Sequence, residues 1–407
     1  MTQTAPMVII GAGMAGARGC INLRANGYVG AITLIGEEAL LPYDRPPLSK
    51  SSIMEEQTPE PVWLMDAAIA RELNVDVLLN VSAKSIDRKA KSVELNGGNS
   101  IAYSKLLLAT GAKPRSLNCP GGEHALTLRD YKDTLELRQR FQPGKNIVII
   151  GGGFIGLELA SSAIKRGCAV TLVEAQPRIL MRGVPETIAK IVHAKHVAAG
   201  VVMLTGVGLQ QITRHDVLLS DGRSIAADTV IAGIGAAPET QLAHAAGLAI
   251  DNGIACNAMM QTSDAEIFAA GDCASFVHPH FSNRRIRLEA WRSAQEQAAT
   301  AAENMCGGSK AHKTMPWFWS DQYDLSLQIA GMADMGPFTV ERKMNDNALI
   351  QFHLADDGTL MGASGIGPGN SIARDVKLAE MMIAKSIKPD ASALADPATQ
   401  LKALLKG

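Results

Sequence analysis

The chain has 407 residues, 47% of them apolar, and its 39 basic and 40 acidic residues leave a formal net charge of −1. This length predicts two or three domains with substantial cores, and the balanced charge argues against a nucleic-acid-binding protein, which needs an excess of Lys and Arg on one face. No apolar run approaches the roughly 18 residues of a membrane span, and the first 19 residues carry no basic segment before their apolar stretch. We therefore expect a cytoplasmic protein with no nucleic-acid or membrane partner.

The first predicted element is a buried strand at 7–10, which runs directly into a G-x-G-x-x-G motif at Gly11, Gly13 and Gly16. A helical stretch and a second apolar strand follow, and the second strand ends at Glu37. In a dinucleotide-binding fold the first glycine allows a tight turn, the second lets backbone N–H groups approach a pyrophosphate, and the third lets helix and strand pack closely. The acid accepts hydrogen bonds from the ribose hydroxyls. This unit therefore predicts a dinucleotide site.

Two further segments of the first unit have distinctive sequences. The segment P-Y-D-R-P-P-L-S-K spans residues 42–50, and a strand at 106–108 runs into an A-T-G turn at Ala109, Thr110 and Gly111. Proline and glycine residues that follow this turn mark the beginning of the next unit.

The strand–glycine–helix pattern returns near residue 150. A buried strand at 147–150 precedes Gly151, Gly153 and Gly156, and a later apolar strand ends at Glu174. One such glycine pattern proves little, because a chain with 38 glycines is expected to contain roughly 0.3 copies by chance. Two copies, each between a strand and a helix and each with an acid 23 to 26 residues after its first glycine, predict two dinucleotides, a bound flavin and a nicotinamide that comes and goes.

The last third of the chain returns to the first unit and then opens a new region. A strand at 230–232 leads into a G-I-G-A-A-P turn, and a strand at 267–270 ends in Gly-Asp. The new region opens with P-W-F-W at residue 316, and it contains strand-like residues at 348–352 and an amphipathic helix at 375–385.

These elements predict an α/β fold with two Rossmann-like dinucleotide-binding domains and a C-terminal α+β domain. The predicted domains are 1–113 with 241–316 for FAD, 114–240 for NADH, and 317–407 for the C-terminal part.

Cysteine and histidine spacing argues against a metal site and against a redox disulfide. Six cysteines are scattered, and none stands in a C-x-x-C or C-x4-C pattern. His193 and His196 lie three apart on a predicted helix, and we interpret them as part of a solvated helix face. We predict no metal site.

Taken together, these motifs resemble the flavoproteins that have two dinucleotide-binding domains. The segments at 42–50 and 316–322 make the chain similar to the ferredoxin reductases that serve Rieske oxygenases and bacterial cytochromes P450, and the likeness covers essentially the whole chain. The resemblance implies FAD and NADH as cofactors, hydride transfer from NADH to the flavin, and transfer of single electrons to a 2Fe–2S ferredoxin. It also implies that the ferredoxin docks transiently, through electrostatic attraction.

The resemblance also assigns residues to the two cofactors. Glu37 matches the ribose contact of the flavin dinucleotide, Asp272 the acid that binds the ribityl chain, and Trp291 the position whose backbone N–H faces the flavin pyrimidine edge. The full flavin set is Gly11, Gly13, Ala15, Gly16, Glu37, Arg45, Lys50, Val81, Ala109, Thr110, Gly111, Arg129, Gly271, Asp272 and Trp291. The NADH set is Gly151, Gly153, Phe154, Ile155, Gly156, Glu174, Arg182, Gly235 and Trp319.

Lys50 and Glu158 are the expected catalytic pair. In this family a lysine and a glutamate at these positions pair beside the flavin N5, and we place Glu158 in the first turn of the helix that follows the second glycine motif, where the helix dipole favours a carboxylate. The alternative makes Glu158 a capping acid and Lys50 a surface cation. The resemblance puts Trp319 against the nicotinamide, whereas a packed core is an equally good explanation of the cluster of Trp317, Phe318 and Trp319.

Several other members of the same superfamily are alternatives. Disulfide reductases need a redox cysteine pair near residues 40–50, and water-forming NADH oxidases and coenzyme A disulfide reductases need a single cysteine there, but this segment has none. Rubredoxin reductases, monodehydroascorbate reductases and apoptosis-inducing-factor-like proteins share most of the motifs and stay open. A redox-sensing scaffold that binds NADH is the alternative from a different class.

Glu174 also predicts a preference for NADH over NADPH. A 2′-phosphate would face its carboxylate and be repelled. Arg178 and Arg182 weaken this prediction, because either could partly accommodate a phosphate.

A basic docking surface is expected, because ferredoxins of this kind are typically acidic. A solvated charged loop is the equally weighted alternative for the basic segment around the flavin-edge position Trp291. The candidate docking residues are Arg284, Arg285, Arg287 and Arg292.

Overall fold

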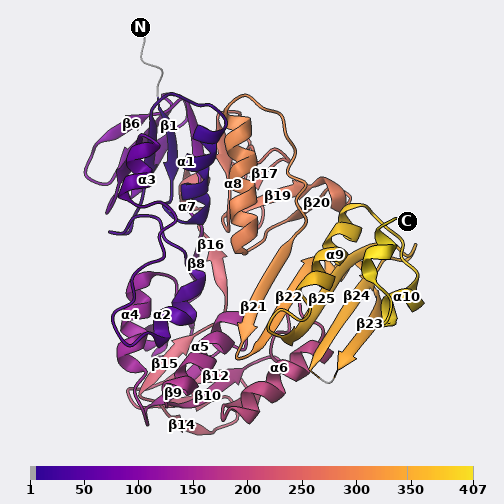
Figure 1. Cartoon of the computed structure of the whole chain (residues 1–407). Helices are drawn as coiled ribbons and strands as arrows, with labels where there is room; N and C mark the ends of the chain where they lie inside the picture. Colours follow the sequence, from indigo (N-terminus) through magenta and orange to yellow (C-terminus); the bar gives the residue numbers. More distant parts are fainter. Residues whose placement is uncertain (1–5, 346, 407) are drawn as a thin grey trace. The chain divides into compact units, whose positions relative to one another are not determined.

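The computed structural model describes residues 6–345 and 347–406 (Figure 1). Residues 1–5, which belong to the segment considered for a signal peptide, lie outside the described residues. The chain forms two compact units, which we call unit 1 and unit 2. Unit 1 comprises Met1–Asp44, Pro61–Lys113 and Ala237–Thr314, and unit 2 comprises Arg45–Glu60, Pro114–Ala236 and Met315–Gly407.

A five-stranded parallel sheet is the centre of unit 1. Its strands follow the order β18-β7-β1-β2-β3. β1 and β2 are buried along their whole length, as expected for a parallel sheet covered on both faces. Ligands bind at the carboxyl ends of such strands, so the loops after β1, β2, β7 and β18 share the functional edge. The bounds are β1 Met7–Ile10, β2 Ile32–Ile35, β3 Val75–Leu78, β7 Lys105–Leu108 and β18 Ile267–Ala269.

Two helices of unit 1, α1 (Met14–Ala25) and α8 (Trp291–Met305), pack side by side (Figure 1). α8 buries small residues, among them Ala294, Ala298 and Ala301, and small side chains let helices approach closely. The remaining elements of unit 1 are α3 Ala67–Glu72, α7 Gln241–Ala245, β4 Ala83–Asp87, β5 Ser92–Leu95, β6 Ser100–Ala102, β17 Ile254–Cys256, β19 Ala274–His278 and β20 Arg284–Ile286.

Unit 2 contains a four-stranded parallel sheet with the order β11-β10-β9-β15. α5 (Phe154–Lys165) follows β9 (Asn146–Ile150), and α4 (Tyr131–Arg140), which precedes β9, begins with a capping box made by Asp130 and Asp133. The other bounds are α2 Ser51–Met54, α6 Glu186–Ala198, β10 Ala169–Glu174, β11 Val202–Thr205, β12 Leu209–Ile212, β13 Asp216–Leu219, β14 Ser224–Ala226 and β15 Thr229–Ala232. The short strands β8 Ala112–Pro114 and β16 Ala236–Pro238 stand at the sequence boundaries of the units.

The C-terminal part of unit 2 is a five-stranded antiparallel sheet with the order β21-β22-β25-β24-β23, on which α9 packs. Leu325 and Leu327 of β22 belong to the same apolar cluster as Ile149 and Leu157, so the antiparallel sheet shares a core with the parallel sheet of unit 2. The bounds are β21 Trp317–Gln322, β22 Leu325–Gly331, β23 Phe338–Asn345, β24 Ala348–Leu354, β25 Leu360–Pro368, α9 Ala373–Ala384 and α10 Ala391–Ala395.

The predicted fold class is confirmed, because two parallel-sheet cores and a C-terminal sheet region are all present. The predicted strand at 348–352 lies within β24, and the predicted amphipathic helix at 375–385 is α9. The exact three-domain boundaries stay a prediction. Among the described residues, no helix combines the length and apolarity that crossing a membrane requires. The cytoplasmic location stays a prediction.

Candidate functional site

The glycine loop of unit 1 has the geometry of a pyrophosphate cradle. Gly11 has a φ of +109°, and a Cβ there would lie 2.1 Å from the carbonyl oxygen of Ala109. A Cβ at Gly16 would lie 1.9 Å from the carbonyl oxygen of Gly11, so neither position accepts a side chain. A Cβ at Gly13, by contrast, would meet no atom of the described residues within 4 Å. The N-terminus of α1 is therefore open at the point where a pyrophosphate would approach.

Other predicted flavin residues of unit 1 lie in the loops at the same edge of the sheet. A Cβ on Gly271, after β18, would lie 3.1 Å from the Cβ of Ala15, so the turn closes tightly over α1. The Thr110 hydroxyl, after β7, donates to the carbonyl oxygen of Glu239 at 2.7 Å. Glu37, two residues after the end of β2, is exposed. The Val81 N–H donates to the carbonyl oxygen of Gly36, the residue directly before Glu37. Gly111 (φ +72°) and Asp272 complete these loops.

Trp291 gains a side-chain role that sequence reasoning did not identify. It is the first residue of α8, and its indole N–H donates to Asp44 Oδ1 at 2.6 Å. The neighbouring Tyr43 hydroxyl donates to Glu38 Oε2 at 2.5 Å. These two bonds hold the beginning of the P-Y-D-R-P-P-L-S-K segment within unit 1.

The glycine loop of unit 2 repeats this geometry closely. Gly151 again has a φ of +109°, and a Cβ there would lie 2.5 Å from the carbonyl oxygen of Gly233. A Cβ at Gly156 would lie 2.2 Å from the carbonyl oxygen of Gly151, whereas a Cβ at Gly153 would have its nearest contact at 3.7 Å. Phe154 and Ile155 then begin α5. Two loops with one geometry fit two dinucleotides.

Glu174 closes β10 beside this loop. Its Oε2 accepts the N–H of Gly152 at 2.7 Å, and its Oε1 accepts the N–H of Gln176 at 2.7 Å. Arg178 donates to three backbone carbonyls between residues 179 and 184, so its guanidinium is occupied. Arg182 lies against Gly235, where its Nη2 would be 3.4 Å from a Cβ.

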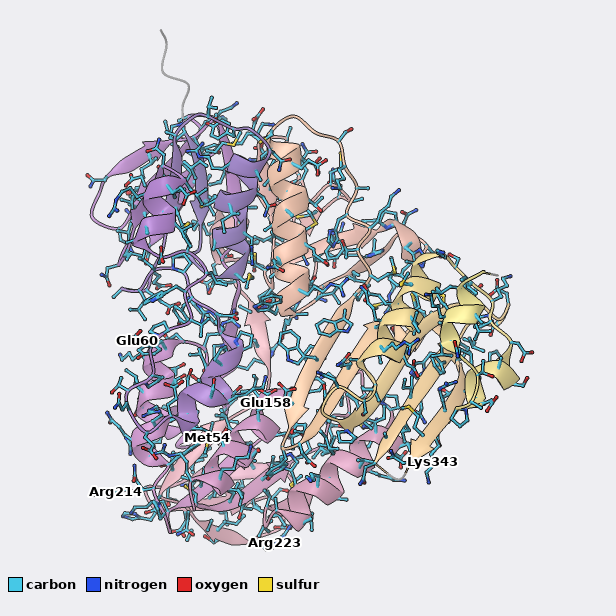
Figure 2. All side chains as sticks on the ribbon, in the orientation of Figure 1. Met54, Glu60, Glu158, Arg214, Arg223 and Lys343 are labelled. Carbon is cyan, nitrogen blue, oxygen red and sulfur yellow. The ribbon has the colours of Figure 1, made fainter. Side chains whose placement is uncertain are left out.

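The structure brings together the predicted catalytic pair of unit 2. Lys50 Nζ lies 3.3 Å from Glu158 Oε1 and 3.5 Å from Asp321 Oδ2. Glu158, labelled in Figure 2, is 6% exposed and Lys50 is 26% exposed. Lys50 Nζ also lies 5.8 Å from the ring centroid of Trp319, within the cation–π range. Arg45 and Arg129, two more predicted flavin residues in unit 2, meet through a hydrogen bond from the Arg45 guanidinium to the Arg129 carbonyl oxygen.

One expectation about Glu158 is wrong. Glu158 is the fifth residue of α5, whose first turn contains no acidic residue, because the helix begins at Phe154 directly after the glycine loop. Its carboxylate does not cap the helix but accepts two hydroxyl hydrogen bonds, from Ser49 Oγ at 2.5 Å and from Ser320 Oγ at 2.7 Å. Sequence reasoning missed both serines, although each stands directly beside a predicted site residue.

The expectation of a solvated face at His193 and His196 is wrong for His196. Its ring is fully buried, and its Nε2 lies 2.9 Å from Gln322 Oε1 on β21. Burial lowers the pKa of His196 to about 4, against the raising effect of the Gln322 hydrogen bond. The periodicity of α6 shows which residues share a helix face but not which other element covers that face. The residue that covers His196, Gln322 on β21, lies 126 positions further along the chain.

Strand alternation divides the aromatic cluster of β21. Trp317 and Trp319 stack with their ring centroids 5.4 Å apart. Phe318 points to the other face of the strand, where its ring centroid lies 4.4 Å from that of Phe154 on α5. Phe318 is therefore a packing residue. The position of Trp319 beside Lys50 is consistent with a nicotinamide contact, which stays a prediction.

The four candidate docking arginines differ in their exposure and contacts. Arg285 donates to two backbone carbonyls and lies 3.2 Å from Asp251, Arg287 pairs with Glu289, and Arg292 pairs with Glu296. Arg284 is exposed on β20 and is the most accessible of the four.

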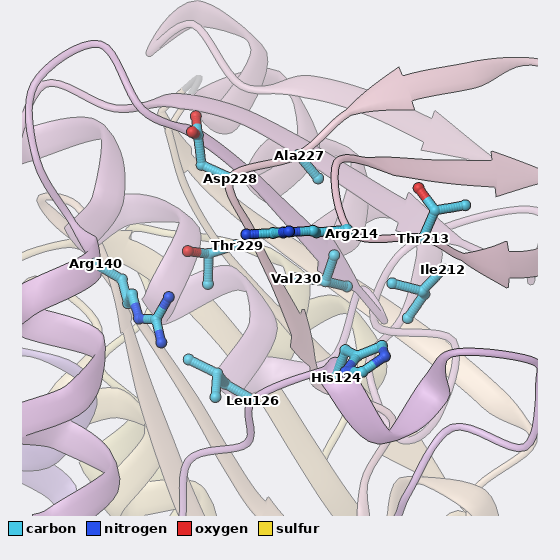
Figure 3. A pocket seen from close by; sticks show the side chains of 10 residues that line it. All are labelled: His124, Leu126, Arg140, Ile212, Thr213, Arg214, Ala227, Asp228, Thr229 and Val230. Carbon is cyan, nitrogen blue, oxygen red and sulfur yellow. The ribbon is translucent and has the colours of Figure 1, made fainter.

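A cavity of about 450 Å³ in unit 2 contains none of the predicted cofactor residues (Figure 3). The cavity lies beside the residues that begin β15. The glycine loop follows the end of the parallel strand β9, and therefore lies at the opposite edge of the sheet. Arg140, one of its basic lining residues, pairs with Glu136, and Asp228 pairs with Lys145. Separately, the described residues contain no cluster of three or more His, Cys, Asp or Glu side chains able to hold a metal ion.

Comparison with known proteins identifies the family. Residues 5–298 match the pyridine nucleotide-disulphide oxidoreductase family, and residues 317–405 match the reductase C-terminal family. The chain belongs to the pyridine nucleotide-disulphide oxidoreductase family. The predicted resemblance is confirmed, and the chain is an oxidoreductase that uses FAD and NAD(H).

Individual relatives make the likeness more specific. The ferredoxin–NAD(+) reductase component of an anthranilate 1,2-dioxygenase system from Burkholderia cepacia is 37% identical, over 98% of this chain and 99% of the relative. Putidaredoxin reductase from Pseudomonas putida is 38% identical over 81% and 80%. Among solved structures, putidaredoxin reductase in covalent complex with putidaredoxin matches 99% of this chain and 98% of the other, with a TM-score of 0.93 and 32% identity.

Proposed function

We propose that this protein is an NADH:ferredoxin oxidoreductase, which passes electrons from NADH through FAD to a 2Fe–2S ferredoxin that feeds an oxygenase of the Rieske or cytochrome P450 type. The observation that carries the proposal is the combination of two matching glycine loops, a Lys50–Glu158 pair, and a segment at 40–50 that lacks the cysteines expected of disulfide reductases. Bound FAD accepts electrons in pairs and releases them singly, which suits a one-electron carrier as acceptor.

The residues of the chain have defined tasks in this proposal. The open N-termini of α1 and α5 bind the two pyrophosphates, and Glu174 holds the nicotinamide dinucleotide by its ribose. Lys50 is held by Glu158 and Asp321 at the flavin, and Trp319 orients the nicotinamide ring. Such a reaction needs orientation and exclusion of water more than it needs a strong general base.

Rubredoxin is the second candidate acceptor. A rubredoxin–NAD(+) reductase from Pseudomonas putida is 39% identical, but the likeness covers 80% of this chain, against 98% for the dioxygenase-system reductase. The broader coverage favours a ferredoxin.

The first prediction concerns cofactor and acceptor. Purified protein should retain FAD rather than FMN, as shown by chromatography of the released flavin, and NADH should reduce it. Adding a 2Fe–2S ferredoxin should restore NADH-dependent reduction of cytochrome c. Faster turnover with rubredoxin in parallel assays would show that rubredoxin is the better acceptor. Slow flavin reduction without turnover with either carrier would point to a redox-sensing scaffold.

The second prediction concerns docking of the acidic ferredoxin, which we propose to be transient and electrostatic. Arg284→Glu should slow ferredoxin reduction at low salt and leave flavin reduction by NADH unchanged, because the exposed charge of Arg284 steers encounter. The defect should shrink near 0.5 M salt, where the Debye length is only about 4 Å. Arg285 is unsuitable for this test because its internal bonds support the fold. Normal ferredoxin reduction by Arg284→Glu at low salt would place docking elsewhere.

A further inference from the structure

The carboxylate of Glu158 is held on both oxygens. Ser49 Oγ donates to Oε2, and Ser320 Oγ donates to Oε1, the same oxygen that lies 3.3 Å from Lys50 Nζ. Both serines are buried, and Ser320 is fully so. Ser49 is itself fixed, because the Ser162 hydroxyl of α5 donates to its carbonyl oxygen at 2.7 Å. A buried carboxylate with two hydroxyl donors keeps one orientation.

A buried chain of hydrogen bonds continues behind Ser320. Gln322 Nε2 donates to Ser320 Oγ at 2.9 Å, and Gln322 Oε1 lies 2.9 Å from His196 Nε2. The Tyr323 hydroxyl then lies 3.5 Å from His196 Nδ1. Glu158, Ser320, Gln322 and His196 are all buried.

Every bond in this chain has one permitted direction. The Ser320 hydroxyl donates its one proton to the Glu158 carboxylate, so it must in turn accept from the Gln322 amide N–H. The Gln322 amide oxygen then accepts, so His196 carries its proton on Nε2 and leaves Nδ1 as an acceptor for Tyr323. Burial keeps His196 neutral and Tyr323 protonated, because it lowers the pKa of His196 to about 4 and raises the pKa of Tyr323 to about 12. Donors aligned in one direction polarise one another toward Glu158.

Charged groups lie near both ends of this series of hydrogen bonds. Lys50 and Asp321 stand at the Glu158 end, and Asp321 is 48% exposed. At the other end, Lys195 pairs with Asp324, and Lys165 Nζ lies 5.7 Å from the Tyr323 ring centroid. The Ser320 and Gln322 side chains, in the middle of this series of hydrogen bonds, carry no charge.

We propose that Ser320, supported by Gln322 and His196, is a positioning residue that aims the Glu158 carboxylate at Lys50 and thereby sets the rate at which NADH reduces the bound flavin. This inference rests on the proposed role of the Lys50–Glu158 pair. It gives β21 a second task beyond presenting Trp319, because Ser320 and Trp319 are adjacent and point to opposite faces of the strand.

The test compares Ser320→Ala, Ser320→Thr and Ser326→Ala in the FAD-loaded protein. Ser326 is a matched control: it is a buried serine on β22 that accepts a hydrogen bond from Gln328, two residues away, as Ser320 does from Gln322. Rapid mixing with NADH should show flavin reduction slowed about 10- to 100-fold in Ser320→Ala, the effect expected for one lost hydrogen bond to a charged group. Ser320→Thr, which keeps the hydroxyl, should recover most of the rate, and Ser326→Ala should match the unaltered protein.

A second measurement does not depend on turnover. Thermal unfolding midpoints of Ser320→Ala, Glu158→Gln and the double variant form a double-mutant cycle. Ser320→Ala should lower the midpoint by less in the Glu158→Gln background than in the unaltered protein. Additive midpoint shifts together with an unchanged rate in Ser320→Ala would overturn the proposal.

Glu158→Gln distinguishes the proposed role of the Lys50–Glu158 pair from the proposed positioning role of Ser320. If Glu158→Gln does not slow flavin reduction, the pair itself lacks the proposed role. If Glu158→Gln slows it while Ser320→Ala does not, the role of the pair stands and the positioning proposal fails.

Discussion

At the scale of single residues, the surroundings of Glu174 bear on the choice between NADH and NADPH. Gly152 and Gln176 orient its carboxylate, and Arg178, which the sequence allowed as a phosphate partner, is bonded to backbone carbonyls. Glu174→Ala should therefore reduce the ratio of kcat/KM for NADH over that for NADPH by about 10- to 100-fold, since one charge-assisted contact is lost and one repulsion is removed. Steady-state kinetics with both donors measures this ratio. Arg182→Gln is the comparison variant. A change of equal size in this ratio would show that the selectivity does not depend on Glu174 alone but also on Arg182.

At the scale of elements, one buried arginine holds the end of the chain. Arg342 on β23 is 4% exposed, and its guanidinium donates to four backbone carbonyls between residues 394 and 399. Asp375 of α9 lies 3.6 Å from its Nε. The guanidinium fork makes these bonds together, and a lysine ammonium cannot.

Arg342→Lys should therefore lower the free energy of unfolding by roughly 2–4 kcal/mol, because carbonyls are left without donors inside the protein. Chemical denaturation of the FAD-loaded protein measures the loss. Arg374→Lys, at an exposed position of α9, should change it by less than about 0.5 kcal/mol. Equal stability of the two variants would show that the arginine bonds contribute little.

At the scale of the whole molecule, buried histidines in both units link stability to pH. Burial lowers the pKa of His196, His312 and His353 from 6.5 to about 4. Between these values the unfolded chain binds protons that the folded chain does not, so the free energy of unfolding falls as the pH drops from about 7 to about 4. Each of these histidines contributes a loss on the order of 3 kcal/mol over that window.

Thermal unfolding of the FAD-loaded protein at intervals between pH 7.5 and 4.5 should show a midpoint that decreases steadily toward acid. His353→Gln should flatten this dependence, since one titrating group is removed. A midpoint that stays constant from pH 7 to pH 5 would show that these histidines are protonated in the folded protein.

The amino-acid sequence by itself determined the two glycine loops, the strands before them and the acids after them. These features obey local rules: a φ of +109° at Gly11 and Gly151 needs glycine, and a strand buried on both faces needs a continuous apolar run. The same local information indicated the fold class, whereas the pairing of Lys50 with Glu158 was implied only by the resemblance to the ferredoxin reductases.

The tertiary structure alone decided which groups surround those residues. Ser320 reaches Glu158 across 162 positions of sequence, Gln322 buries His196 across 126, and Trp291 reaches Asp44 across 247. No periodicity or motif in one segment reveals a partner that another segment supplies, because side-chain contacts over such separations depend on how the elements pack. For that reason Glu158 proved to be held by hydroxyl groups rather than placed as a helix cap, and His196 proved to be buried rather than solvated.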